Sequence, residues 1–163
     1  MKTFSDCVQE YRKLVKQGDV VTAYRGLMEF MATLRTHFRN RHPEFSVSGN
    51  LYFGYMDMTY FPLVPEKLKV KGLKIAIVLI HEDIRFEAWL SGTNKTIQAE
   101  YWEMFRKKRW EHYRIPESLQ GRDSIVECDL AVNPGFSDPG ALIRQIEERT
   151  IRFIDDITDF LET

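Results

Sequence analysis

The stretch from Leu73 to Gly92 constrains the fold of this chain more than any other. Its first part, LKIAIVLIH, is apolar almost throughout, and its second part, IRFEAWLSG, alternates between apolar and polar residues. A continuous apolar run is typical of a central strand covered on both faces, whereas alternation is typical of a strand with one buried and one wetter face. Glu82 and Asp83 lie between the two parts as a tight turn. The stretch therefore predicts a β-hairpin with its first strand at the centre of a sheet.

Two helices are predicted ahead of this hairpin, over residues 5–17 and from Asp19 to about Pro43, with Gly18 between them. Apolar residues recur at helical spacing in both: Phe4, Val8, Tyr11 and Val15 in the first, and Val20, Tyr24, Leu27, Met31, Leu34 and Phe38 in the second. A short connection is typical of an antiparallel helix pair. We therefore expect the two stripes to pack in one core, with Cys7 on the inner half of the first helix.

Four further segments complete the expected secondary structure. The aromatic run of residues 51–61 favours a strand, which Pro62 and Pro65 would end, and residues 66–72 read as an exposed connection or a short helical turn. Helices are predicted over residues 95–108, capped by Gly92-Thr93-Asn94, and over 139–161, with Asp138 as its cap and Pro139 at its first position. Residues 124–132 alternate and predict a strand.

These elements follow the order α-α-β-β-β-α-β-α and predict a single α+β domain over residues 1–163. The simplest arrangement is a mainly antiparallel sheet of about four strands with helices against one face. Hydrophobic residues make up 44% and charged residues 29% of the chain, a balance that is typical of a folded globular protein and excludes a disordered one.

The sequence also predicts a cytoplasmic protein. The longest uninterrupted apolar run spans six residues, from Ile75 to Ile80, whereas a helix that crosses a bilayer needs about 20. The first residues lack the apolar core of a signal peptide. Cys7 and Cys128 lie far apart in the sequence, so no disulfide framework is expected.

Charge is distributed unevenly along the chain. Residues 1–122 carry 20 Lys and Arg against 14 Asp and Glu, and residues 123–163 carry 3 against 10. Such asymmetry can indicate an anionic partner for the basic part. It also fits an acidic last helix packed beside basic elements of the same chain, and we favour this interpretation because the total nearly cancels.

No local motif predicts a metal, a cofactor or a nucleophile. His37 and His42 are five residues apart, His81 and His112 are isolated, and no zinc-type spacing occurs. The chain has no nucleophile elbow, and its glycines form no phosphate-binding loop. Cys7 and Cys128 read as small core residues. No complete catalytic set is readable, so we lean towards a protein that is not an enzyme.

A metal-dependent hydrolase or nuclease is one alternative. Many metal-dependent nucleases place an Asp on one strand and Glu-x-Lys on the next, where carboxylates hold the ion and lysine steadies the attacking water. Asp57 and Glu87 would supply the carboxylates. The residue two positions after Glu87 is Trp89 rather than lysine, so the decisive element is missing unless Lys95 replaces it.

Nucleic-acid binding is a second alternative, through the basic and aromatic segment from Tyr101 to Arg114. Cationic groups neutralise phosphates and aromatic rings stack on bases. The residues that would do so are Trp102, Arg106, Lys107, Arg109, Trp110 and Arg114. The simpler interpretation is that the basic residues favour the dipole at a helix C-terminus and that the aromatic residues anchor the helix to the sheet.

A candidate ligand or partner face surrounds Trp89, because a tryptophan on the polar side of a strand gains much from being covered. The cover could be a helix of the same chain, a partner subunit in a homodimer, or a small molecule in a cleft. Arg85 and Glu87 are near enough to pair with each other. The candidate residues are Tyr52, Tyr55, Asp57, Arg85, Glu87, Trp89, Asn94 and Lys95.

The segments SGNLYFGYMDMTYF, LKIAIVLIHEDIRFEAWLSGTNKTIQAEYW and NPGFSDPGALIRQIE resemble a bacterial family of proteins of roughly 160 residues catalogued only as a domain of unknown function. The resemblance covers nearly the whole chain. It implies a stand-alone bacterial cytosolic protein, and it brings no activity, substrate or site residue. From the residues themselves, a soluble cytosolic binding or interaction domain is the favoured function.

Overall fold

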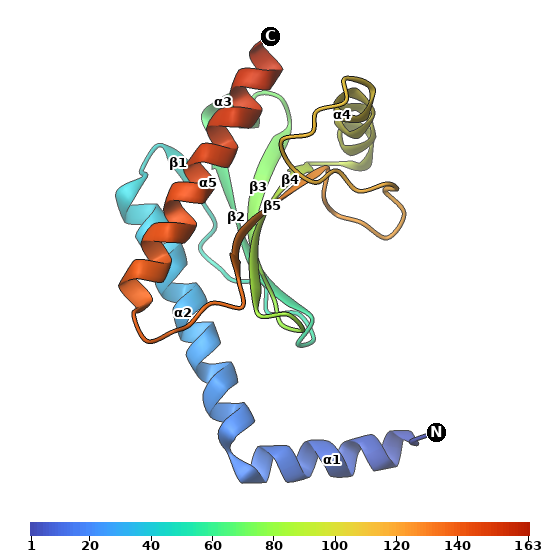
Figure 1. Cartoon of the computed structure of the whole chain (residues 1–163), viewed down its shortest axis with the longest axis vertical. Coiled ribbons are helices and arrows are strands. Elements are labelled where there is room, and N and C mark those ends of the chain that lie inside the picture. Colours follow the sequence, from blue (N-terminus) through green and yellow to red (C-terminus); the bar gives the residue numbers. More distant parts are fainter.

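A computed structural model describes all residues of the chain, Met1–Thr163, as five helices and five strands (Figure 1). The elements are α1 (Phe4–Gln17), α2 (Asp19–Arg41), β1 (Phe45–Val47), β2 (Met58–Pro65), α3 (Glu66–Lys69), β3 (Leu73–Ile80), β4 (Arg85–Gly92), α4 (Lys95–Lys107), β5 (Val126–Val132) and α5 (Pro139–Glu162). The strands form one sheet in chain order, and each neighbouring pair is antiparallel. The predicted α+β fold is confirmed, and the short β1 is the strand that the sequence did not indicate.

The predicted hairpin is confirmed as β3 and β4, and β3 is the central strand of the five. The two strands pair from Leu73 opposite Gly92 to Ile80 opposite Arg85. The turn between them places Ile84 at a positive φ of 49°. Val78 on β3 is fully buried on the sheet face away from the main core, as expected for a central strand.

The sheet has two unlike faces because successive side chains of a strand point to opposite sides. One face carries Ile77, Phe86, Ala88 and their neighbours and packs under α2 and α5 (Figure 1). This core contains 26 buried apolar residues. The helix predicted over residues 139–161 is confirmed as α5, and its core-facing residues Ile143, Ile146, Thr150, Phe153, Ile154 and Ile157 are buried. The other face carries the alternate residues and is described below.

The acidic α5 meets the basic end of α2, which supports the second interpretation of the charge asymmetry. Glu147 on α5 lies 3.0 Å from His37, 2.6 Å from His42 and 3.9 Å from Arg41. Burial raises the pKa of the Glu147 carboxyl, but the hydrogen bonds from the two histidines outweigh that effect, and the net pKa is lowered. The Glu147 side chain is only 13% exposed, so it ties the two helices together from within their interface.

Helix α4 and helix α5 lie to different sides of the sheet (Figure 1), and the irregular segment after α4 contacts α5 through Trp110 and Phe160. Asn94 caps α4 as predicted, with its side chain accepting from the Ile97 N–H. Gln98 in the first turn accepts from the Gly92 N–H at 2.6 Å and ties the helix to β4. The segment after α4 is joined to β5 through backbone hydrogen bonds between Arg114 and Glu127.

The prediction of a strand over residues 51–61 is wrong in its bounds. Of residues 51–57, only Tyr52 pairs, in an isolated bridge with Tyr60. The chain then turns through Gly54 and Met56, both at positive φ, and the Asp57 carboxylate accepts from the Tyr55 N–H. Strand β2 begins after this turn, at Met58.

The expectation that Pro62 ends the strand is also wrong, because β2 continues through it, whereas Pro65 is the last residue of β2, as predicted. Pro62 sits opposite Ala76 of β3, and its carbonyl accepts from the Ser48 N–H just beyond β1. The backbone nitrogen of Pro62 therefore points towards residues beyond the end of β1. Its missing N–H removes no hydrogen bond between the two strands.

The predicted antiparallel pairing of the first two helices is wrong. Helix α1 contains no buried residue and stands out from the body of the molecule (Figure 1). Only Gly18 separates α1 from α2, whereas an antiparallel helix pair needs a loop of about 2–5 residues. Cys7 is consequently exposed rather than in a core, while Cys128 is buried, which raises the pKa of its thiol to about 12.

None of the helices is at once long and apolar enough to span a lipid bilayer.

Candidate ligand-binding cleft

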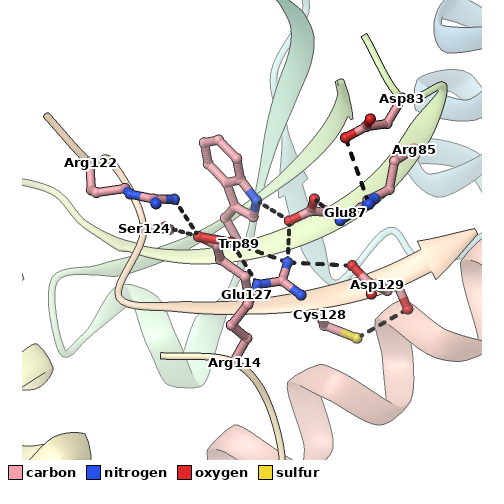
Figure 2. Close-up of polar contacts among 10 residues, drawn as sticks. All are labelled: Asp83, Arg85, Glu87, Trp89, Arg114, Arg122, Ser124, Glu127, Cys128 and Asp129. Atoms are coloured by element: carbon pink, nitrogen blue, oxygen red, sulfur yellow. Dashed lines mark hydrogen bonds and ion pairs between the residues drawn. The ribbon is translucent and has the colours of Figure 1, made fainter. Parts of the chain in front are cut away.

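The second face of the sheet carries a cluster of charged side chains around Arg114 (Figure 2). The Arg114 Nη2 atom lies 2.9 Å from Glu87 Oε1 on β4, and 3.2 Å and 3.4 Å from carboxylate oxygens of Glu127 and Asp129 on β5. Arg114 comes from the irregular segment after α4, so the cluster joins three separate parts of the chain. We refer to Glu87, Arg114, Glu127 and Asp129 as the Arg114 cluster.

Two carboxylates of the Arg114 cluster are as buried as core residues. Glu87 is 2% exposed and Glu127 is 6% exposed. Burial raises the pKa of Glu87, against the lowering effects of the Trp89 N–H and of Arg114. For Arg114, partial burial lowers the pKa of the guanidinium, but the three carboxylates outweigh it and the net pKa is raised. The guanidinium therefore stays charged and compensates carboxylates that would otherwise be costly to bury.

Trp89 is fixed in place by this cluster. Its indole N–H donates to Glu87 Oε1 at 3.0 Å, and its ring stands on the sheet beside the ion pairs (Figure 2). The predicted pairing of Arg85 with Glu87 is confirmed at 3.8 Å, and Arg85 also lies 3.6 Å from Asp83. Glu87 is thus held between Arg85 and Arg114, and its hydrogen bond to the indole N–H fixes the orientation of the half-buried Trp89 ring.

A cleft of about 760 Å³ opens beside the Trp89 ring. Its floor is the sheet, through Met58 and Tyr60 of β2, Ala76 of β3 and Trp89 of β4. Its walls are α4 on one side and residues 119–123 on the other. Ligand pockets in proteins are typically about 300–1,000 Å³ and are mainly apolar with a few polar groups, so both the size and the floor of this cleft suit a small molecule.

The charged side chains that line the cleft are mostly cationic. They are Lys74, Lys95, Arg122 and Asp123. Arg122 lies 3.5 Å from Glu127 of the Arg114 cluster, whereas no carboxylate lies within ion-pair distance of Lys74 or Lys95. The Gln98 Nε2 atom, also at the cleft, is buried without a hydrogen-bond partner. The two free ammonium groups favour an anionic ligand.

The structure distributes the predicted ligand face over three places. Trp89 and Lys95 line the cleft, and Arg85 and Glu87 lie beside it, where they fix the indole. The other candidates have local contacts. The Tyr52 ring packs 4.8 Å from that of Tyr60, Tyr55 is 93% exposed in the turn before β2, the Asp57 carboxylate binds the Tyr55 N–H, and Asn94 caps α4.

Sequence reasoning missed Lys74, Gln98 and residues 119–123. Lys74 could have been predicted, because it interrupts the apolar run of β3. A lysine near the end of a buried strand has to place its ammonium group at the surface of the protein. Residues 119–123 carried no such signal, since nothing in their sequence indicates which face of the sheet they cross.

Asp57 and Glu87 are not brought together. They lie two strands and three residues apart along the register, a separation of roughly 14 Å between their Cα atoms.

The residues of the basic and aromatic segment differ in their contacts within the chain. Trp102 donates its N–H to the Pro116 carbonyl and carries Arg106 over its ring at 4.8 Å. Trp110 stacks on Phe160 of α5, with ring centroids 4.9 Å apart. Arg114 belongs to the Arg114 cluster, and only Lys107 and Arg109 stay exposed without such contacts. The two indoles are thus engaged within the chain.

Comparison with known proteins assigns the chain to a family. The model described as domain of unknown function (DUF7000) matches residues 4–161, and the chain therefore belongs to the DUF7000 family. No curated protein and no solved structure matches the chain. The match covers α1 to α5, so the cleft and the Arg114 cluster both lie within the family domain.

Proposed function

We propose that this protein binds a small anionic molecule that carries a flat apolar or aromatic group. The observation that carries the proposal is the Trp89 ring on the floor of a cleft of about 760 Å³ whose Lys74 and Lys95 have no ion-pair partner. The ring of the ligand would lie on the indole, and its anionic group would lie between the two lysines.

The geometry supports binding because Trp89 needs no reorganisation to receive a ligand. Its indole N–H is held by Glu87, and Glu87 is held by Arg114. A binding surface that is ordered before the ligand arrives avoids the entropy cost of ordering it on binding.

No catalytic role is proposed for the cleft. The Ser91 hydroxyl donates to the Asp123 carbonyl, and the three carboxylates of the Arg114 cluster are paired with the Arg114 guanidinium.

A fluorescence titration with two matched probes tests the proposal. Anilinonaphthalene sulfonate carries aromatic rings and a negative charge, whereas N-phenylnaphthylamine has the same rings without the charge. We expect the anionic probe to bind more tightly to the unchanged protein. The Lys74→Gln/Lys95→Gln variant should remove this preference, because the two unpaired cations of the cleft are neutralised while the apolar floor is kept.

The control variant is Phe136→Ala, which alters a separate apolar groove on α2 and should leave the preference intact. Equal affinity for the two probes, or a preference that survives the double lysine change and disappears in Phe136→Ala, would contradict the proposal.

The other sequence-based hypotheses stay proposals with less support. A metal-dependent hydrolase would need Asp57 and Glu87 to act together across about 14 Å. Nucleic-acid binding through residues 101–114 would have to proceed without stacking on Trp102 and Trp110, and a salt-dependent binding assay tests it. A homodimer through the Trp89 face competes directly with a ligand in the cleft.

A single domain over residues 1–163, residence in the cytoplasm and a bacterial source also stay predictions of the sequence.

A further inference from the structure

Helix α1 presents an apolar stripe that nothing in its own chain covers. Phe4, Val8, Tyr11 and Val15 are 86%, 40%, 62% and 38% exposed, although they recur at the spacing of one helix face. Such a stripe normally faces a core. A helix of this length is marginal alone in water, because most helical stability in proteins comes from packing an apolar face.

The connection to α2 prevents α1 from folding back on its own chain. Gly18 is the single residue between the helices, and it is hydrogen-bonded on both sides: its N–H donates to Leu14, and its carbonyl accepts from the Thr22 N–H. Packed helices need axes about 8–10 Å apart, and one residue spans only about 3.8 Å. The stripe is therefore open to contact with another molecule.

The same chain contains an apolar groove of about 650 Å³ that is unfilled. It runs along α2 and is closed by the β3–β4 turn and by the segment leading into α5. The residues that make it apolar are Ala23, Leu27, Phe30, Ile84, Phe136 and Ile143. Phe136 is 37% exposed at its rim. A groove of this kind accepts the apolar face of a helix.

The charges of α1 and the groove are complementary. Glu29 is the one charged residue that lines the groove, and no cation lies within ion-pair distance of it. Arg12 follows Val8 by four residues and precedes Val15 by three, which places it at the edge of the stripe. Arg12 has no ion-pair partner either.

We propose that α1 is an arm exchanged between two copies of this chain. The apolar stripe of each α1 lies in the α2 groove of the other copy, with Arg12 opposite Glu29. Because each copy gives one arm and receives one, the arrangement closes as a twofold dimer and leaves no stripe uncovered. This interface is separate from the Trp89 cleft, so it stands or falls independently of the proposed ligand.

Sedimentation equilibrium over a range of protein concentrations tests the dimer. The unchanged chain should form dimers, and the Val8→Asp/Tyr11→Asp variant should be monomeric at the same concentrations. Both side chains are exposed on a helix that packs on nothing in its own chain, so the variant should still fold, which circular dichroism checks. The matched control is Tyr55→Asp, an exposed tyrosine in the turn before β2, which should leave the dimer intact.

A charge exchange tests the assignment of the groove. Arg12→Glu and Glu29→Arg should each weaken dimerisation, by up to about tenfold because two rim pairs are lost per dimer. The Arg12→Glu/Glu29→Arg double variant should restore it. In a mixed sample of differently labelled copies, NMR should detect contacts between Tyr11 of one copy and Phe136 of the other.

A chain that remains monomeric at every concentration would overturn the proposal. So would a dimer that persists in Val8→Asp/Tyr11→Asp, or a double charge variant no better than either single one.

Discussion

The two faces of the sheet are built from alternate residues of the same strands, and they are organised by different forces. On β4, Phe86, Ala88 and Leu90 point to the helices and join the apolar core, whereas Glu87 and Trp89 point to the cleft. Glu87 is 2% exposed, hardly more than the core residues beside it. Apolar side chains fill the helix-covered face, whereas paired charged side chains bury part of the cleft-side face.

The difference shows where stability and recognition reside in this molecule. Apolar packing is strong and non-directional, so the helix-covered face contributes most to the free energy of folding. Hydrogen-bonded charges contribute less net energy but fix orientation. The face with the Arg114 cluster is therefore suited to holding Trp89 in one orientation beside a cleft. Substitutions on the two faces should separate these contributions.

The largest effect is expected from Ile77→Ala on the helix-covered face. Ile77 is fully buried in the core, and removing its side chain should lower the free energy of unfolding by about 2–5 kcal/mol. Urea denaturation measures this loss as a shift in the transition midpoint. Val64→Ala, at a half-buried position on the other face of β2, is the control and should cost much less. Equal losses would remove the distinction between the faces.

The next effect is expected from Arg114→Met, which leaves Glu87 and Glu127 without their shared cation. The loss should be about 1–3 kcal/mol at neutral pH, below the cost of breaking a fully buried pair because the Arg114 side chain is 45% exposed. Arg122→Met, which removes one more exposed contact to Glu127 at 3.5 Å, is the matched control and should have little effect.

The loss in Arg114→Met should depend on pH in a defined direction. The pKa of Glu87 is already raised in the folded protein, and removing the cation raises it further. A raised carboxyl pKa favours folding below the unfolded pKa, and this contribution is lost as pH rises through the folded pKa. The deficit of the variant should therefore shrink as pH falls. A deficit that is constant from neutral to acidic pH would exclude an electrostatic cause.

Glu147→Gln tests a polar contact within the helix-covered layer. It should cost about 1 kcal/mol at neutral pH, because the carboxylate bonds to His37 and His42 are weakened. The folded pKa of Glu147 lies below its ordinary value of 4.5, so its contribution is present above that value and is lost as pH falls through the folded pKa. Unfolding curves recorded across this range should converge for the two proteins. The opposite pH trend would contradict the pairing.

The smallest effect on stability is expected from Trp89→Phe. An aromatic ring is kept at this half-buried position, and the main loss is the N–H bond to Glu87, so the cost should be about 0.5–1 kcal/mol. Probe binding should change more than stability, since the ring is no longer held in one orientation. Thermal unfolding and the fluorescence titration, measured on the same sample, compare the two. A loss as large as that of Ile77→Ala would mean that Trp89 is a core residue.

The parts of the fold that the sequence predicted are those with local signals. The hairpin of β3 and β4 follows from a change of periodicity around a polar turn. Helices α4 and α5 follow from Asn94 and Asp138 as caps, and these predictions are confirmed. Each signal lies within a few residues of the feature that it specifies.

The parts that were not predicted depend on contacts between distant residues. Strand β1 has three residues and no periodicity, and the β2 boundary is set by the turn at Gly54 and Met56 rather than by strand propensity. The orientation of α1 depends on a single-residue link. Arg114 and Glu87 are 27 positions apart, and their ion pair exists only because β5 lies next to β4. For the same reason Trp89 could be identified as unusual, but not the cleft beside it.

The most direct test of the proposed cleft is the NMR signal of the Trp89 indole N–H, identified by its loss in Trp89→Phe. The account predicts that anilinonaphthalene sulfonate shifts this signal in proportion to binding, while the N–H signals of Trp102 and Trp110 move little. It also predicts that Lys74→Gln/Lys95→Gln needs a higher probe concentration to give the same shift. Binding of the probe with no change at the Trp89 N–H would contradict the account.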